Sequence, residues 1–155
     1  MRALNHEHLF ALPLRADNGL DLSKYTGTPR LATAAATLQK DSDYVVAVTE
    51  LGERYRIARN GSLAHGDFHP GSHLQTAAGV KVIDPKCCFY GDAEFDLEVF
   101  AAHVLLADES PGRAEDVFAS YNPRQNSRMP LGRQYAEVDI VRRLIDVAQI
   151  PPLSC

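Results

Sequence analysis

HGDFHPGSHLQTAAGVKVIDPKCCFYGDAEFD, residues 65–96, is the stretch on which the fold and the chemistry of this chain depend. Its three acidic residues Asp67, Asp84 and Asp96 each lie at a junction between expected regular elements. A short carboxylate at such a junction can point into a cleft, because loops on a rigid scaffold carry binding and catalytic side chains. The stretch therefore predicts a site that combines a base with a metal ligand.

A β-hairpin is expected between the two ends of this stretch. Residues 72–77 favour one strand, residues 78–79 a two-residue turn, and residues 80–83 the return strand. Because a hairpin brings its ends together, Asp67 and Asp84 should be neighbours. Phosphoryl transfer uses such a pair, since one carboxylate orients and deprotonates the attacking hydroxyl while another holds the magnesium that bridges the phosphates.

These motifs resemble the aminoglycoside phosphotransferase and choline kinase superfamily. Ser72 and the spacing from Asp84 to FYG at 89–91 are most similar to its methylthioribose kinase branch. Several separated motifs occur in the order and spacing of that family. They are HGDFHPGS at 65–72, VIDP at 82–85, FDL at 95–97, LNHEH at 4–8 and VAQIP at 147–151.

The resemblance implies a role for each polar residue of the stretch. Asp67 would be the catalytic base and Asp84 a magnesium ligand. Asp96 would brace the catalytic loop from the following helix. Ser72 stands where most of these kinases carry a metal-binding asparagine, so it is implied as a further metal ligand, directly or through water.

His65 and His69 flank the implied base. The resemblance implies that both support the loop through hydrogen bonds. Direct catalysis by His69 is the alternative, and it is disfavoured because the transfer needs only one base.

The implied fold class is α+β and mostly helical, namely the C-terminal lobe of a protein-kinase-like fold with a small β-hairpin that carries the metal ligand. Kinases of this superfamily use an N-terminal lobe with a phosphate-covering loop and a strand lysine. No such segment fits before His65 in the expected order. Residues 1–155 are therefore expected to form a single domain without a nucleotide lobe.

The implied function is ATP-dependent phosphorylation of a hydroxyl on a small sugar-like molecule, of the methylthioribose or aminoglycoside type. ATP and Mg²⁺ are the implied cofactors. The expected partner is the small-molecule substrate. Two further alternatives are that the chain forms a homodimer or that it binds a separate chain that carries the nucleotide lobe.

Two residues depart from the pattern of the methylthioribose kinase branch. Lys86 stands where that branch usually has glutamate, and Glu98 stands where it has glycine. Lys86 would place a positive charge where a metal cation should bind. The alternative function is therefore a degenerate, non-catalytic lobe that binds a partner or a metabolite.

A third hypothesis follows from residue types alone. His65, Asp67, His69 and Asp84 offer the nitrogen and oxygen donors of a metal-dependent hydrolase. It is disfavoured because no further histidine with ligand spacing lies nearby.

Composition excludes several other classes of protein. The net charge of -4 and the lack of a basic stripe argue against a nucleic-acid binder. With 45% hydrophobic and 23% charged residues, the chain has a globular balance, and no apolar run approaches the ~18 residues of a membrane span. A polar start without a signal-like apolar run predicts a cytoplasmic protein. The three cysteines fit no disulfide framework, so Cys87 and Cys88 are expected as small reduced residues beside the site.

Hydrophobic periodicity predicts five helices around the central stretch. They begin at residues 28–29, near 42, at 94, at 110–111 and near 133, and the second ends at 60–61. Residues 4–14 are expected to be extended, because Pro13 interrupts them, and residues 122–132 are expected to form a loop. His73 should lie on the outer face of the hairpin, and His103 should be a hydrogen-bonded histidine of the core.

Overall fold

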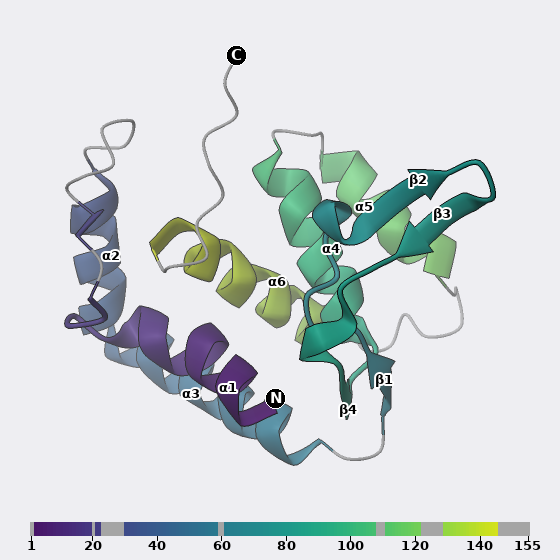
Figure 1. Ribbon diagram of the computed structural model, residues 1–155. Helices are drawn as coiled ribbons and strands as arrows, with labels where there is room; N and C mark the ends of the chain where they lie inside the picture. Colours follow the sequence, from purple (N-terminus) through teal and green to yellow (C-terminus); the bar gives the residue numbers. More distant parts are fainter. Residues whose placement is uncertain are drawn as a thin grey trace.

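The computed structural model describes residues 2–19, 21–22, 30–58, 61–107, 111–121 and 129–145. This part of the chain is mostly helical and contains two small antiparallel sheets (Figure 1), so the predicted mostly helical α+β class is confirmed. The helices are α1 (Arg2–His6), α2 (Leu31–Lys40), α3 (Ser42–Ile57), α4 (Glu94–Leu106), α5 (Pro111–Tyr121) and α6 (Met129–Ile145). The strands are β1 (Ser62–Ala64), β2 (His73–Thr76), β3 (Gly79–Val82) and β4 (Phe89–Gly91).

The N-terminal segment is helical, so the prediction of an extended segment was wrong. After α1 the chain continues as a π-helical turn, Glu7–Ala11, and a 3₁₀ turn, Leu12–Leu14. Pro13 lies in the first turn of this last element, a position that tolerates proline because no backbone N–H is needed there. Packing decides the conformation, because Phe10 is buried against α3 at Gly52, where an added Cβ would lie 2.9 Å from the Cβ of Phe10.

The helix α3 begins at Ser42, as the sequence pattern predicts. Asp41 caps its N-terminus, because the Asp41 carboxylate accepts hydrogen bonds from the backbone N–H groups of Asp43 and Tyr44 at 3.0 and 3.1 Å. The helix ends at Ile57, a little before the predicted stop at 60–61. The predicted start of the preceding helix at 28–29 lies outside the described residues, and α2 is described from Leu31.

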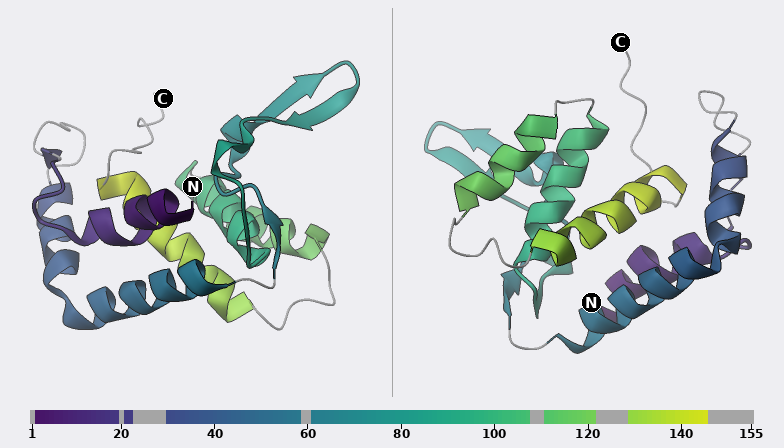
Figure 2. Two further views of the ribbon diagram at one scale, coloured as in Figure 1. Left: turned by 60° about the horizontal axis from the view of Figure 1, so that its bottom comes forward. Right: turned by 180° about the vertical axis from the view of Figure 1, so that it is seen from behind.

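The last helix begins earlier than the sequence pattern predicts. Met129–Gly132 belongs to α6 instead of to the predicted loop, whose other residues lie outside the described part of the chain. Pro130 is again in a first helical turn, where proline is tolerated. Gly132 lies against α4, since an added Cβ would come within 2.2 Å of Glu98 Oε1. Close packing of α4 and α6 therefore explains the glycine (Figure 2).

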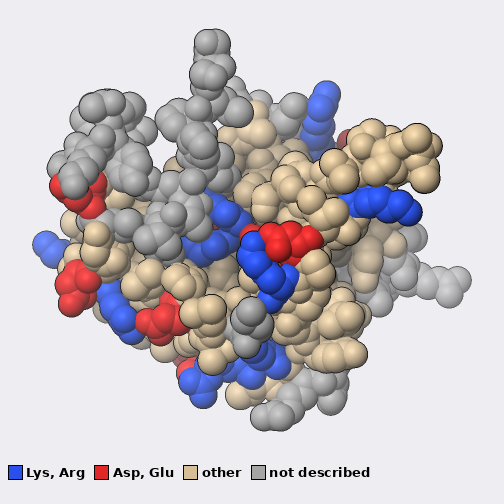
Figure 3. Space-filling view, in the orientation of Figure 1, with Lys and Arg blue, Asp and Glu red and all other residues tan. Residues whose placement is uncertain are grey.

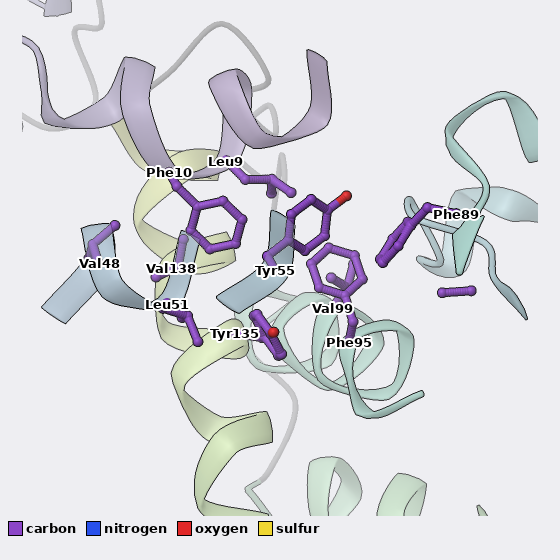
Figure 4. Close-up of a cluster of buried hydrophobic side chains, with 11 residues drawn as sticks. Leu9, Phe10, Val48, Leu51, Tyr55, Phe89, Phe95, Val99, Tyr135 and Val138 are labelled. Carbon is purple, nitrogen blue, oxygen red and sulfur yellow. The ribbon is translucent and has the colours of Figure 1, made fainter. Parts of the chain in front are cut away.

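An aromatic cluster joins these helices into one core (Figure 4). The ring of Tyr55 from α3 lies 4.7 Å from that of Phe89 in β4 and 5.4 Å from that of Phe95 in α4. Tyr135 of α6 and Phe10 of the N-terminal segment complete the cluster. Each fully buried large side chain stabilises the fold by about 1.5–3 kcal/mol, so this cluster fixes β4 and the start of α4 relative to α3 and α6.

The two sheets bring the ends of the central stretch together. β1 pairs with β4, with Ala64 opposite Phe89, and β2 pairs with β3, with His73 opposite Val82. The predicted β2–β3 hairpin is confirmed, but its turn is Ala77–Ala78, one residue earlier than predicted. Thr76 closes this turn, because its hydroxyl donates to the carbonyl of Gly79 and accepts from the N–H of Ala78.

The hairpin extends away from the helices in the left view of Figure 2. Its base is anchored by His73, which was wrongly predicted to lie on the outer face. The His73 ring is half-buried, with its centroid 4.7 Å from that of Phe68 in the loop and 5.5 Å from that of Phe100 in α4. Burial against these two aromatic rings outweighs solvent exposure of the imidazole.

Candidate functional site

The loop 65–72, between β1 and β2, is held from behind by α4. Asp96, in the first turn of that helix, accepts hydrogen bonds from two consecutive backbone N–H groups, of His65 at 2.5 Å and of Gly66 at 2.9 Å. Burial raises the pKa of Asp96, although these two hydrogen bonds oppose the rise. Gly66 has φ +83°, and an added Cβ would come within 2.2 Å of the carbonyl oxygen of Cys87, so the loop needs glycine here.

His65 links this loop to the end of the hairpin. Its Nε2 lies 2.9 Å from the carbonyl oxygen of Ile83, the residue before Asp84. A carbonyl can only accept, so Nε2 carries the hydrogen and Nδ1 does not unless the ring is charged. Nδ1 is buried, and it has no hydrogen-bond partner among the described residues. His65 thus joins the segments that carry Asp67 and Asp84.

Ser72 is buried at the end of the loop. Its hydroxyl donates to the carbonyl oxygen of Asp67 at 2.7 Å, and its backbone N–H donates to the carbonyl of His69 at 2.8 Å. The hydroxyl hydrogen of Ser72 is therefore used inside the loop, where it helps to fix Asp67. The implied role of Ser72 as a metal ligand stays a prediction.

Asp67 lies between two nitrogen-bearing side chains. Its Oδ1 accepts a hydrogen bond from Arg143 Nη2 at 2.8 Å, and its Oδ2 lies 3.8 Å from His69 Nε2. Burial by itself would raise the pKa of Asp67, but the nearby charges of Arg143, His69 and Arg142 outweigh it, so the pKa is lowered. The carboxylate is therefore ionised near neutral pH.

Asp84 follows β3 in an exposed position with a left-handed backbone, at φ +63° and ψ +52°. Its side chain is 52% exposed, compared with 29% for Asp67. Lys86 Nζ contacts Asp84 Oδ2 directly.

Burial raises the pKa of the Cys87 thiol, and the negative charges of Asp67 and Asp84 raise it further. Both carboxylates therefore lie within electrostatic range of this one thiol.

The charge of Lys86 is directed at the carboxylate that the resemblance assigns to the metal. The pKa of Lys86 is raised by its hydrogen bond and its charge interaction with Asp84. On the face shown in Figure 3, lysine and arginine side chains alternate with acidic ones. A metal cation at Asp84 would have to bind beside the ammonium group of Lys86 or compete with it for Oδ2.

Three residues from α4 and α6 belong to this site although the sequence analysis did not assign them to it. Arg143 pairs with Asp67, as described above. Asp139, which is only 1% exposed, accepts hydrogen bonds at Oδ1 from Arg142, with Nε at 3.0 Å. His103 stacks on His69, with ring centroids 4.8 Å apart and 18° between the planes.

His103 departs from the prediction of a hydrogen-bonded core histidine. Its side chain is buried, but its Nε2 has no hydrogen-bond partner among the described residues and lies 3.7 Å from Asp139 Oδ2. A sequence signal for this cluster exists. Asp139, Arg142 and Arg143 have i, i+3 and i+4 spacing, which places three charges on one helical face.

Glu98, the second departure from the family pattern, lies against α6. It is 2% exposed and lies against Gly132. Burial raises its pKa to about 7, although the charge of Arg133 opposes the rise. At neutral pH a large share of Glu98 is therefore uncharged, which makes its burial between two helices tolerable.

No group of three or more histidine, cysteine or acidic side chains in the described ranges is arranged to hold a metal ion. The ligand set of the hydrolase hypothesis, namely His65, Asp67, His69 and Asp84, is therefore not formed there.

In the described ranges, none of the helices combines the length and the apolar character that crossing a membrane requires. Cys87 and Cys88 are half-buried free thiols.

Comparison with known proteins finds several relatives of this chain. Two relatives are methylthioribose kinases 1 and 2 of Oryza sativa subsp. japonica, which are 35% identical over 88 residues and 30% identical over 109 residues. These matches cover 56% and 69% of this chain but 20% and 24% of the relatives. The methylthioribose kinase of Exiguobacterium sibiricum is 45% identical over 51 residues, which are 33% of this chain and 13% of that protein.

The chain thus spans about a quarter or less of the curated relatives described above. Residues 7–136, most of the chain, match the phosphotransferase enzyme family. That range contains the whole loop, the hairpin, Asp84 and the first turn of α4 with Asp96. By this match the chain belongs to the phosphotransferase enzyme family.

Proposed function

We propose that this chain is the catalytic lobe of an ATP-dependent phosphotransferase that acts on a hydroxyl of a small sugar-like molecule. The observation that carries the proposal is Asp67, an ionised carboxylate held between Arg143 and His69 on a loop that Asp96 fixes. The similarity to methylthioribose kinases favours a methylthioribose-like acceptor over an aminoglycoside. In this proposal residues 1–155 form one domain, the C-terminal lobe of a kinase-like fold.

Asp67 is the proposed base. Its lowered pKa makes it a weak proton acceptor, so its main contribution is to orient the attacking hydroxyl through a hydrogen bond. This suffices for a loose transition state, in which the transferred group carries most of the charge and little proton transfer has occurred. The guanidinium of Arg143 lies beside the carboxylate and can stabilise negative charge that develops there.

Asp84 is the proposed magnesium ligand. Mg²⁺ prefers oxygen ligands and is commonly bound through one or two carboxylates together with phosphates of the substrate, and the exposed carboxylate of Asp84 fits that chemistry. The hydroxyl of Ser72 is the weaker candidate, because it is buried and hydrogen-bonded within the loop. When bound, Mg²⁺ would supply positive charge to the phosphates of ATP, the proposed donor.

Asp67→Asn, made in an enzyme that combines this lobe with a nucleotide lobe, tests the role of the base. We expect phosphate transfer from ATP to methylthioribose to fall by about a thousandfold, while ATP binding, measured by isothermal titration calorimetry, stays the same. Asp43→Asn is the matched control, because Asp43 is exposed in the first turn of α3. Turnover that survives in the Asp67 variant would contradict the assignment.

A non-catalytic lobe is the second candidate function, and one contact favours it. Lys86 contacts one oxygen of the carboxylate that the proposal assigns to the metal, and its positive charge opposes a cation there. Titration of the chain with ATP in the presence and in the absence of Mg²⁺ separates the two functions. A catalytic lobe should bind ATP more tightly with Mg²⁺, whereas binding of the small molecule without any Mg²⁺-dependent binding of ATP would favour the non-catalytic lobe.

A further inference from the structure

The two side chains that flank Asp67 are supported by a second pair of residues behind them. We propose that Asp139 and His103 are positioning residues, with Asp139 orienting Arg143 and His103 orienting His69, so that both flanking groups stay fixed at the carboxylate of Asp67. This inference rests on the proposed function, since it assumes that Asp67 is the base.

The first half of the argument is the contact between Asp139 and Arg143. The guanidinium of Arg143 reaches two carboxylates, with Nη2 at 2.8 Å from Asp67 Oδ1 and Nε at 3.6 Å from Asp139 Oδ1. Asp139 is almost fully buried and lies one helical turn before Arg143 on α6. A fixed anion at that place restricts the rotamers of a long side chain that otherwise has many.

The second half is the stacking of the two imidazoles. The rings of His69 and His103 lie nearly parallel at 4.8 Å, and His69 Nε2 lies 3.8 Å from Asp67 Oδ2. Because the side chain of His103 is only 9% exposed, it has little room to move. Burial lowers the pKa of His103 to about 4, with further lowering by Arg143, His69 and Arg142 and opposition from Asp139. The ring is therefore uncharged near neutral pH and adds no repulsion to the arginines.

The two supports meet at the carboxylate of Asp139, with Arg143 near Oδ1 and His103 near Oδ2. Asp139 Oδ2 and His103 Nε2 are 3.7 Å apart, and neither has a hydrogen-bond partner among the described residues. Buried charges without full pairing destabilise a fold relative to apolar residues of similar size. Because the carboxylate of Asp139 lies behind Arg143 and His103, we attribute its burial to the orientation of Arg143 and, through His103, of His69.

Asp139→Asn, made in a protein that combines this lobe with a nucleotide lobe, tests the first half. We expect kcat for phosphate transfer to fall by about tenfold with KM unchanged, and the guanidinium N–H resonances of Arg143 to show faster rotation by NMR. Asp139→Glu, which keeps the charge, should restore both measurements in part. Glu137→Gln removes an exposed charge from the same helix and is the matched control. A folded Asp139→Asn protein with unchanged kcat and unchanged Arg143 resonances would overturn the inference.

His103→Asn tests the second half and remains decisive if Asp139→Asn does not fold. Three-bond couplings to Cγ of His69 report its χ1 rotamer. We expect one rotamer in the wild type and averaging in the variant, and a single rotamer retained in the variant would overturn the inference. If no protein in the series transfers phosphate, the proposed function fails, whereas the NMR measurements still decide whether Asp139 and His103 fix their neighbours.

Discussion

The loop 65–72 and the β2–β3 hairpin supply the two carboxylates of the proposed site in different ways. Asp67 on the loop is paired with Arg143 from a distant helix, and its side chain is 29% exposed. Asp84 at the end of the hairpin is paired with Lys86, two residues along the chain, and is 52% exposed. The proposed base is thus positioned by the helical core, whereas the candidate metal ligand depends on local backbone conformation and on a neighbour in sequence.

This difference predicts that the core and the hairpin respond unequally to truncation. Phe95→Ala should lower the free energy of unfolding by about 3–5 kcal/mol, because Phe95 is buried against Tyr55, Phe89 and Tyr135. Val80→Ala, on the exposed hairpin, should change it by less than about 0.5 kcal/mol. Urea denaturation measures both. Similar losses would show that the hairpin is as well packed as the core.

Glu98 should make the stability of the helical core depend on pH. Its pKa in the folded protein is about 7, compared with 4.5 for an unperturbed glutamate. Between pH 4.5 and pH 7 Glu98 is protonated in the folded state but not in the unfolded state. The stability that this protonation contributes is therefore complete below pH 4.5 and is lost as the pH rises through 7. Glu98→Gln should therefore stabilise the protein by up to about 3 kcal/mol at pH 8, relative to the wild type, and have little effect at pH 4.

Thermal unfolding from pH 4 to pH 8 checks this prediction. Glu50→Gln on the exposed face of α3 is the matched control and should follow the wild type. A difference between Glu98→Gln and the wild type that stays constant across this range would contradict the assigned titration.

The support of the loop by α4 can be tested separately from the core. Asp96→Asn replaces one of two accepting oxygens by a donor, which leaves a backbone N–H of the loop without its partner. We expect a loss of about 1–3 kcal/mol and faster hydrogen exchange at His65 and Gly66. Glu94→Gln removes a charge from the same first turn and should leave exchange in the loop unchanged. Protection at those two amides that survives in the Asp96 variant would contradict the bracing role.

The smallest expected effect concerns the hairpin end. Lys86→Glu removes the cation that contacts Asp84, so Mn²⁺, used as a probe for Mg²⁺, should bind roughly two- to fivefold more tightly. Paramagnetic broadening of the amide resonances near Asp84 measures the affinity. Lys81→Glu makes the same charge change within β3 and is the control. Equal gains in both variants would mean that net charge, and not the contact at Asp84, controls the binding.

The features that could be predicted from sequence depend on local signals. The hairpin, α3 and α4 follow from turn residues and helical periodicity, both within a few residues of the element itself. The helical start of the chain could not be predicted in this way, because Pro13 favours a break and the packing of Phe10 on Gly52 joins distant segments. The same reason applies to the site. Asp67 and Asp84 stand in a recognisable motif, whereas Arg143 becomes a neighbour of Asp67 only through the packing of α6.

The ion pair between Asp67 and Arg143 spans 76 positions of the chain. During synthesis at about 5–20 residues per second, roughly 4 to 15 seconds separate the appearance of these two residues. The proposed base therefore exists for a time without its cationic partner and acquires it only when α6 docks on α4. The ion pair at the proposed base therefore forms late in synthesis and folding. A nascent chain in which α6 has not yet been synthesised lacks it.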